Sequence, residues 1–321
     1  MSRPSRMFTS AAVLLLMLAL LVPLAPTQTS HAQGGPLEVV ATVGMIGDAV
    51  VNIGGDRVNV NTLMGPGVDP HLYKPTAGDA RDFERADIIF YGGLHLEGRM
   101  IDVLEKVGRI KPVIAVAESI PEELLRTPPE FDGQHDPHVW FDVTLWMIVV
   151  QTIATELAVH SPENAEYFQS NAKTYLAQLQ ELDTWIRAEV ARVPADQRVL
   201  VTAHDAFGYF GDQYGFEVHG IQGVSTATEA SASDIQDLTD LIVGRQVRAM
   251  FVESSVPPAT IEAVQEASRS RGWEVGIGEH LFSDAMGESG TFEGTYIGMV
   301  TWNVNAIVSA LAGDSAATPT N

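Results

Sequence analysis

Short β-rich runs alternate with helix-length stretches in two separate sets along this chain. A strand, a helix and a further strand in succession are typical of a parallel sheet whose crossover helices cover its faces. The chain has 321 residues, 45% of them hydrophobic, so it is long enough to bury more than one core. We therefore predict an α/β protein with two βα lobes, each containing a mostly parallel four-stranded sheet. The first set of predicted strands covers residues 38–42, 58–63, 87–91 and 112–116, and the second covers residues 198–202, 216–219, 247–252 and 273–277.

One long helix is predicted between the two sets, at residues 161–194. Ser161 is a candidate N-cap, Pro162 suits the first helical position and Pro194 marks the end. Because no Gly or Pro interrupts this stretch, we expect a stiff rod of about 45 to 50 Å that joins the lobes and permits only small opening motions. The alternative is a helix packed wholly within one domain. Apolar residues recur on one face at Phe168, Ala172, Tyr175, Leu179, Leu182, Ile186, Val190 and Val193.

The connecting helix divides the chain into a first lobe at residues 37–160 and a second lobe at residues 195–313. Residues 314–321 are mostly small and polar, which predicts a disordered tail.

The N-terminus has the pattern of a secretory signal peptide. Arg3 and Arg6 precede an apolar run at residues 11–24, and small residues follow, so we predict that residues 1–32 are removed. An uncleaved anchor is the alternative, although the run is short for a membrane span. The chain has no cysteine, so it has no disulfide, no thiolate ligand and no cysteine after the apolar run to carry a lipid. We expect a secreted or periplasmic, extracytoplasmic protein.

The chain is strongly acidic. It carries 41 acidic and 19 basic residues, a formal net charge of −22. A field of this sign repels phosphate backbones, so nucleic acid is not an expected partner. Acidity of this kind concentrates cations only weakly, and it usually serves solubility.

Four residues spaced roughly seventy positions apart are candidate metal ligands: His71, His138, His204 and Asp284. Each lies in a loop, and three follow predicted strands, where open α/β sheets bind ligands. Two belong to each half of the chain, so they can meet only if the two sheets face each other across a cleft. Three imidazoles and a carboxylate suit a borderline divalent cation such as zinc. The triplet Asp-Pro-His occurs at residues 69–71 and again at residues 136–138, which chance could supply.

The remaining histidines are interpreted as surface or hydrogen-bonded side chains, because that is the usual role of a lone histidine. His135 is the rival of His138 for the second ligand position. The others are His31, His95, His160, His219 and His280.

Each ligand histidine needs an acceptor on its other ring nitrogen. Asp69, Asp136, Asp142 and Asp205 are near in sequence, but Asp69 and Asp136 are equally suited to turns or caps, so no acceptor is assigned. Two further acids could act as hidden catalytic bases, but a simpler interpretation is preferred. Glu253 and Glu279 are interpreted as solvated acids at a strand end and in a loop.

These motifs closely resemble those of the metal-specific solute-binding proteins of ABC importers, the TroA-type zinc and manganese receptors. The resemblance covers nearly all of the chain after the signal peptide. It implies two βα lobes joined by one rigid helix, with a metal ion buried between them and handed to a membrane permease. It also places His71, His138, His204 and Asp284 at the family's ligand positions. The motifs are DPHLY at residues 69–73, HDPHVW at 135–140, TAHDAF at 202–207, GVST at 223–226, FVESS at 251–255, LFSDA at 281–285 and GTY at 294–296.

The resemblance also bears on the metal. Members that favour manganese often have Glu at the third ligand position, so His204 favours zinc, as does the nitrogen-rich donor set. The long His-rich loop of some zinc receptors is absent, which removes one indication of zinc. We expect Zn²⁺, with Mn²⁺ or Fe²⁺ as alternatives.

Two other classes of function remain open from the residues alone. A secreted zinc hydrolase could use the same donors, but no Gly-x-Ser-x-Gly or His-Glu-x-x-His motif is present, and four protein ligands close a tetrahedral site. A surface adhesin or scaffold has no contrary motif. We expect a monomeric binding protein rather than an enzyme.

Overall fold

The structure is a computed structural model that describes residues 35–313. The predicted signal peptide at residues 1–32 and the predicted tail at residues 314–321 lie outside the described residues.

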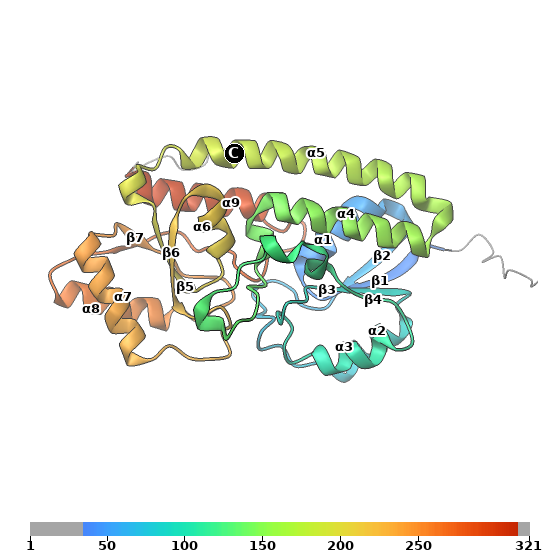
Figure 1. The fold of residues 1–321 in the computed structure, drawn as a ribbon, viewed down its shortest axis with the longest axis horizontal. Coiled ribbons are helices and arrows are strands. Elements are labelled where there is room, and N and C mark those ends of the chain that lie inside the picture. Colours follow the sequence, from blue (N-terminus) through green and yellow to red (C-terminus); the bar gives the residue numbers. More distant parts are fainter. Residues whose placement is uncertain (1–34, 314–321) are drawn as a thin grey trace, which may run out of the picture. The chain divides into compact units, whose positions relative to one another are not determined.

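The first sheet is four-stranded and parallel throughout, as predicted. Its strands are β1 (Leu37–Ala41), β2 (Val58–Thr62), β3 (Ile88–Tyr91) and β4 (Val113–Ala115), in the order β2-β1-β3-β4. The connecting segments contain α1 (Gly44–Gly54), α2 (Ala77–Arg85) and α3 (Ile101–Gly108) (Figure 1). Central strands are apolar on both faces because helices cover both sides of a parallel sheet.

The second half contains the four other predicted strands, two of them very short, but they form two two-stranded sheets and not the single four-stranded sheet that was expected. β5 (Val199–His204) pairs in parallel with β6 (Glu217–Gln222), and β7 (Ala249–Met250) pairs in parallel with β8 (Gly276–Ile277). The two ladders meet where the Phe251 N–H donates to the Val201 carbonyl at 2.9 Å. The N–H groups of Gly276 and Gly278 donate to the carbonyls of Arg248 and Met250 at 2.9 and 2.8 Å, and these bonds hold β8 against β7. The helices of this half are α6 (Gly208–Tyr214), α7 (Ala232–Arg245) and α8 (Ala259–Ser270).

A layer of long helices spans both halves. α5 (Ala165–Val190) contacts α1 and α4 (Val143–His160), which precede it in the sequence. It also contacts α6 and α9 (Tyr296–Ala312), which follow it (Figure 1). The predicted apolar stripe of α5 is buried from Phe168 to Val190. α4 is long and apolar enough to cross a membrane, but it packs against α1 and α5.

The connecting helix is shorter than predicted. α5 has 26 residues, which gives about 39 Å at 1.5 Å per residue. A separate 3-10 turn, Pro162–Asn164, precedes it. The predicted N-cap is wrong, because the Ser161 hydroxyl donates to Glu163 at 2.8 Å instead of accepting from the helix backbone.

Candidate metal centre

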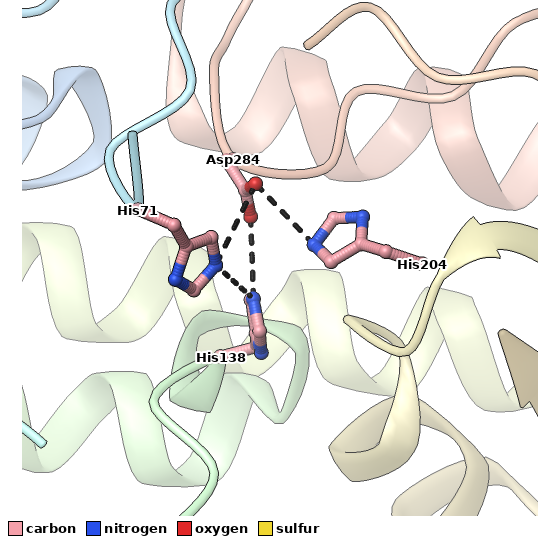
Figure 2. A group of neighbouring side chains, drawn as sticks. All are labelled: His71, His138, His204 and Asp284. Carbon is pink, nitrogen blue, oxygen red and sulfur yellow. Dashed lines mark hydrogen bonds and ion pairs between the residues drawn. The ribbon is translucent and has the colours of Figure 1, made fainter. Parts of the chain in front are cut away.

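The four predicted ligands meet at one buried point. One donor atom from each of His71, His138, His204 and Asp284 lies within 4.8 Å of every other (Figure 2). The Nε2 atoms of His71 and His138 are 3.3 Å apart. The same distance separates His138 Nε2 from Asp284 Oδ1 and His204 Nε2 from Asp284 Oδ2, while His71 Nε2 is 3.9 Å from Asp284 Oδ2. Ligands about 2.0 to 2.1 Å from a tetrahedral ion are separated by about 3.4 Å, which is close to these spacings.

The repeated Asp-Pro-His triplet places the first two histidines. Asp69 Oδ1 accepts the backbone N–H of His71 at 2.8 Å, and Asp136 Oδ1 accepts that of His138 at 2.9 Å. These are Asx turns, in which an Asp side chain bonds the backbone two residues further on. The same local device therefore presents both histidines, from the segment after β2 and from the segment before α4.

The other two ligands come from the second half of the chain. His204 is the last residue of β5 rather than a residue beyond the strand, because β5 runs two residues further than predicted. Asp284 follows a single parallel bridge between Glu253 and Leu281, which extends the pairing of β7 and β8. His204 thus lies at the carboxyl end of the β5–β6 sheet, and Asp284 lies beyond the carboxyl end of the β7–β8 sheet.

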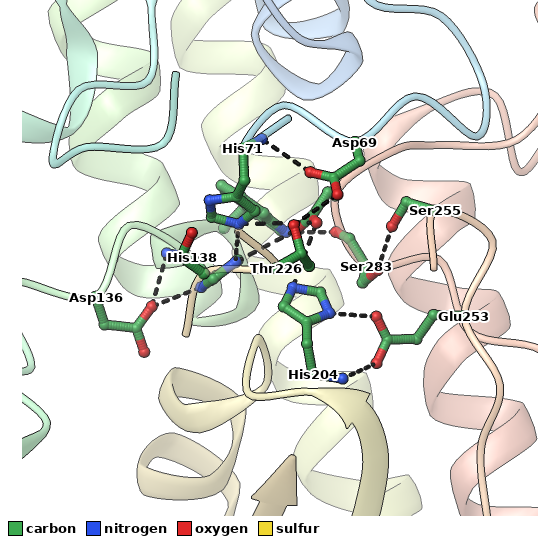
Figure 3. A network of polar contacts seen from close by, with 12 residues as sticks. Asp69, His71, Asp136, His138, His204, Thr226, Glu253, Ser255 and Ser283 are labelled. Atoms are coloured by element: carbon green, nitrogen blue, oxygen red, sulfur yellow. Dashed lines mark hydrogen bonds and ion pairs between the residues drawn. The ribbon is translucent and has the colours of Figure 1, made fainter. Parts of the chain in front are cut away.

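Two buried carboxylates orient two of the rings. His138 Nδ1 lies 2.7 Å from Asp136 Oδ1, and His204 Nδ1 lies 2.5 Å from Glu253 Oε2 (Figure 3). Glu253 also accepts the His204 backbone N–H at 2.9 Å. An acceptor on Nδ1 keeps the proton there and leaves the Nε2 lone pair facing the other donors.

The sequence interpretation of Glu253 as a solvated acid was wrong, since its side chain is buried. Its position directly after the apolar run of β7, beside β5, is the signal that could have identified it. Asp136, to which the sequence alone assigns no acceptor role, is the acceptor for His138. Asp142 instead caps α4 by accepting the Thr144 and Leu145 N–H groups, and Glu279 is exposed, as interpreted.

The remaining described histidines stay outside the cluster. His135, the rival of His138, contacts the Thr127 hydroxyl at 3.1 Å. His160 and His219 face Glu156 and Glu217. His280 packs in an aromatic group with Phe282 and Trp302, His95 is exposed, and His31 lies outside the described residues.

Burial and charge act in opposite directions on these groups. Burial lowers the pKa of His71 to about 3, although Asp284 opposes that shift. Burial also disfavours the charged form of His138, but Asp136 and Asp284 outweigh it and raise the pKa to about 9. The pKa of His204 is likewise raised, because Glu253 and Asp284 outweigh burial. The neighbouring histidines outweigh burial at Asp284 and hold its pKa well below the usual value.

Several of these polar atoms lack a hydrogen bond. Within residues 35–313, His204 Nε2 and both carboxylate oxygens of Asp284 are buried without a hydrogen-bond partner, although they lie at ion-pair distances. Buried polar atoms left in this way are costly unless another group satisfies them. A cation at their common point would do so, and the donor set fits a divalent transition metal.

The fold and the site together define a class of metal-binding α/β protein. Two βα halves share a layer of long helices, and a buried cluster of three histidines and one carboxylate lies between their sheets. A family model described as "Zinc-uptake complex component A periplasmic" matches residues 39–310, and the chain belongs to this family.

Relatives of this chain include proteins named for the metal that they bind. The manganese-binding lipoprotein MntA of Bacillus subtilis (strain 168) is 51% identical over 276 residues, covering 86% of this chain and 90% of MntA. The zinc-binding protein TroA of Treponema pallidum (strain Nichols) is 50% identical over 286 residues, covering 89% of this chain and 92% of TroA. The solved structure of periplasmic TroA from Treponema pallidum superposes with a TM-score of 0.84 at 50% identity, covering 86% of this chain and 99% of that one.

Proposed function

We propose that this protein is the extracytoplasmic solute-binding component of an ABC importer. It captures one divalent transition-metal ion between its two halves and delivers it to a membrane permease. The observation that carries the proposal is the convergence of four buried donor atoms, from four separate segments, within 4.8 Å. Family membership and the names of the relatives support the same conclusion.

The ligands in this proposal are His71, His138, His204 and Asp284. Asp136 and Glu253 hold the two rings whose Nδ1 atoms they contact. Four protein ligands complete a tetrahedral shell and leave no position for an activated water. The arrangement therefore favours capture and release of the ion over hydrolysis. No observation favours a hydrolase.

We propose zinc as the preferred ion. MntA is named for manganese and TroA for zinc at nearly equal identity to this chain, so the names do not separate the two metals. The chemistry of the donors supports zinc, because three imidazole nitrogens bind Zn²⁺ more tightly than Fe²⁺, and Fe²⁺ more tightly than Mn²⁺. Availability in the cell can still place Mn²⁺ or Fe²⁺ in the site.

We further propose that the protein works as a monomer, with lobes at residues 37–160 and 195–313 joined by the segment 161–194 that contains α5. The strands and helices on each side of α5 support these boundaries.

Metal titration tests the proposed function. Chelator-treated protein should bind one Zn²⁺ per chain in calorimetry, with Mn²⁺ and Fe²⁺ displaced in competition. The variant His204→Ala should bind zinc orders of magnitude more weakly, because it removes one of the four ligands and leaves only three to hold the ion.

The matched control is His135→Ala. This variant removes an imidazole beside the second ligand segment but outside the cluster, so its affinity should equal that of the wild type. A wild-type protein that binds none of the three ions, or a His204→Ala variant with unchanged affinity, would refute the proposal.

A further inference from the structure

Asp69 makes two contacts that join the two halves of the chain at the metal centre. One carboxylate oxygen accepts the backbone N–H of the ligand His71 at 2.8 Å. The other accepts the hydroxyl of Thr226 at 2.6 Å, across 157 positions of sequence (Figure 3). Thr226 lies in the segment after β6, in the half that supplies His204 and Asp284. A single side chain therefore ties the His71 segment to the opposite half.

These contacts lie on the solvent side of the centre. Gly65, Pro66 and Gly67 are exposed, and so is Leu72, beside His71. On the other half, residues 227–229 are exposed, while Thr226 itself is buried. His71 is 4% exposed, whereas His138 and His204 are both at 0%, so His71 is the ligand nearest to solvent.

Buried groups also join the two halves beside the centre. The Trp140 indole N–H donates to the Ser283 carbonyl at 3.0 Å, and the Tyr296 hydroxyl donates to the Trp140 carbonyl at 2.7 Å. Trp140 is two residues from His138, and Ser283 is next to Asp284. Opening there would expose a packed core, whereas opening at Asp69 and Thr226 would separate two surface segments.

We infer that the Asp69–Thr226 hydrogen bond closes the metal site and must break before the ion can leave. Thr226 is not among the four clustered donors; it positions the His71 segment through Asp69. Losing its hydroxyl should therefore speed metal release while all four ligands remain. The inference rests on the proposed metal-binding function.

The test compares zinc release from three variants in stopped-flow experiments with excess chelator. Thr226→Val keeps the side-chain shape but removes the hydroxyl donor. Since a hydrogen bond to a charged group is among the stronger ones, release should become about tenfold faster or more, with a smaller change in the association rate. Thr226→Ser keeps the hydroxyl and should release zinc at nearly the wild-type rate.

Thr239→Val is the matched control, because it removes a buried hydroxyl that bonds only within α7, to the Ile235 carbonyl. Its release rate should equal that of the wild type. If Thr226→Val releases zinc at the wild-type rate, the inference is overturned, and a lower melting temperature of its metal-free form would then assign Thr226 to folding alone. A wild-type protein that binds none of the three ions would overturn the proposed function itself, and this inference with it.

Discussion

At the scale of single residues, two buried carboxylates decide which nitrogen of two site histidines can bind an ion. Asp136 and Glu253 both lie against an Nδ1 atom, so the corresponding Nε2 faces the cluster. A histidine without such an acceptor can carry its proton on either nitrogen. The carboxylates therefore contribute to binding although neither is among the four clustered donors.

The variant Glu253→Gln should weaken zinc binding by about 10- to 100-fold. Glu253 serves two donors, the His204 backbone N–H and the Nδ1 side of its ring, with two oxygens. Glutamine has one oxygen and one amide group, so one of the two donors loses its acceptor. The dissociation constant is measured by competition with a chelator of known affinity.

Glu279→Gln is the control for this change, because it makes the same substitution at an exposed glutamate. Its dissociation constant should stay at the wild-type value. Equal affinities for the two variants would show that Glu253 does not orient His204.

At the scale of elements, α5 is held by its buried stripe rather than by its ends. Its predicted cap is absent, and its average hydrophobicity is low, yet eight of its residues are buried against neighbouring helices. Tertiary packing of one face supplies most of the stability of such a helix. α5 contacts elements from both halves of the chain, so this packing also joins the halves.

Leu179→Ala should lower the free energy of unfolding by about 2 to 5 kcal/mol, since it removes a fully buried side chain and leaves a cavity. Urea denaturation of the metal-free protein measures the loss. Gln178→Ala, at the adjacent exposed position of α5, should change stability by no more than about 0.5 kcal/mol. A similar small loss for both variants would contradict the assignment of the buried stripe.

At the scale of the whole molecule, folding buries carboxyl groups remote from the metal centre, and this makes stability depend on pH. Burial raises the pKa of Glu97 above its usual value of 4.5, even though the Thr42 hydroxyl and the N–H groups of Gly92 and Gly93 donate to it. At a pH between the unfolded pKa of Glu97, about 4.5, and its higher folded pKa, the folded protein therefore binds more protons than the unfolded chain. Glu97 therefore contributes stability below about pH 4.5 that is lost as pH rises through its folded pKa.

Glu97→Gln removes this loss, so the variant should gain stability relative to the wild type as pH rises above 4.5. Urea denaturation of both proteins in chelator, at a series of pH values, measures the difference. Glu118 is an exposed glutamate that lines one surface pocket together with Glu97, so Glu118→Gln controls for the loss of one negative charge. A difference between wild type and Glu97→Gln that is constant with pH, or that favours the wild type at high pH, would contradict this account.

The strands and the four clustered residues were predictable because each has a local signal. Alternating β-rich runs and helix-length intervals located the strands, and polar signatures after strand ends located His71, His204 and Asp284. α5 begins later than predicted, at Ala165, because Ser161 has the residue type of an N-cap but bonds Glu163 instead. The residue type alone does not determine which partner the hydroxyl takes.

By itself, the sequence determined the alternation of strands and helices and the residue types available to hold a cation. Only the tertiary structure decided that Glu253 supports His204 and that Asp69 reaches Thr226. The physical reason is the separation in sequence: the first pair is 49 positions apart and the second 157. Contacts of that range depend on which strand lies beside which and on how the two halves meet, and no local pattern of residues records either.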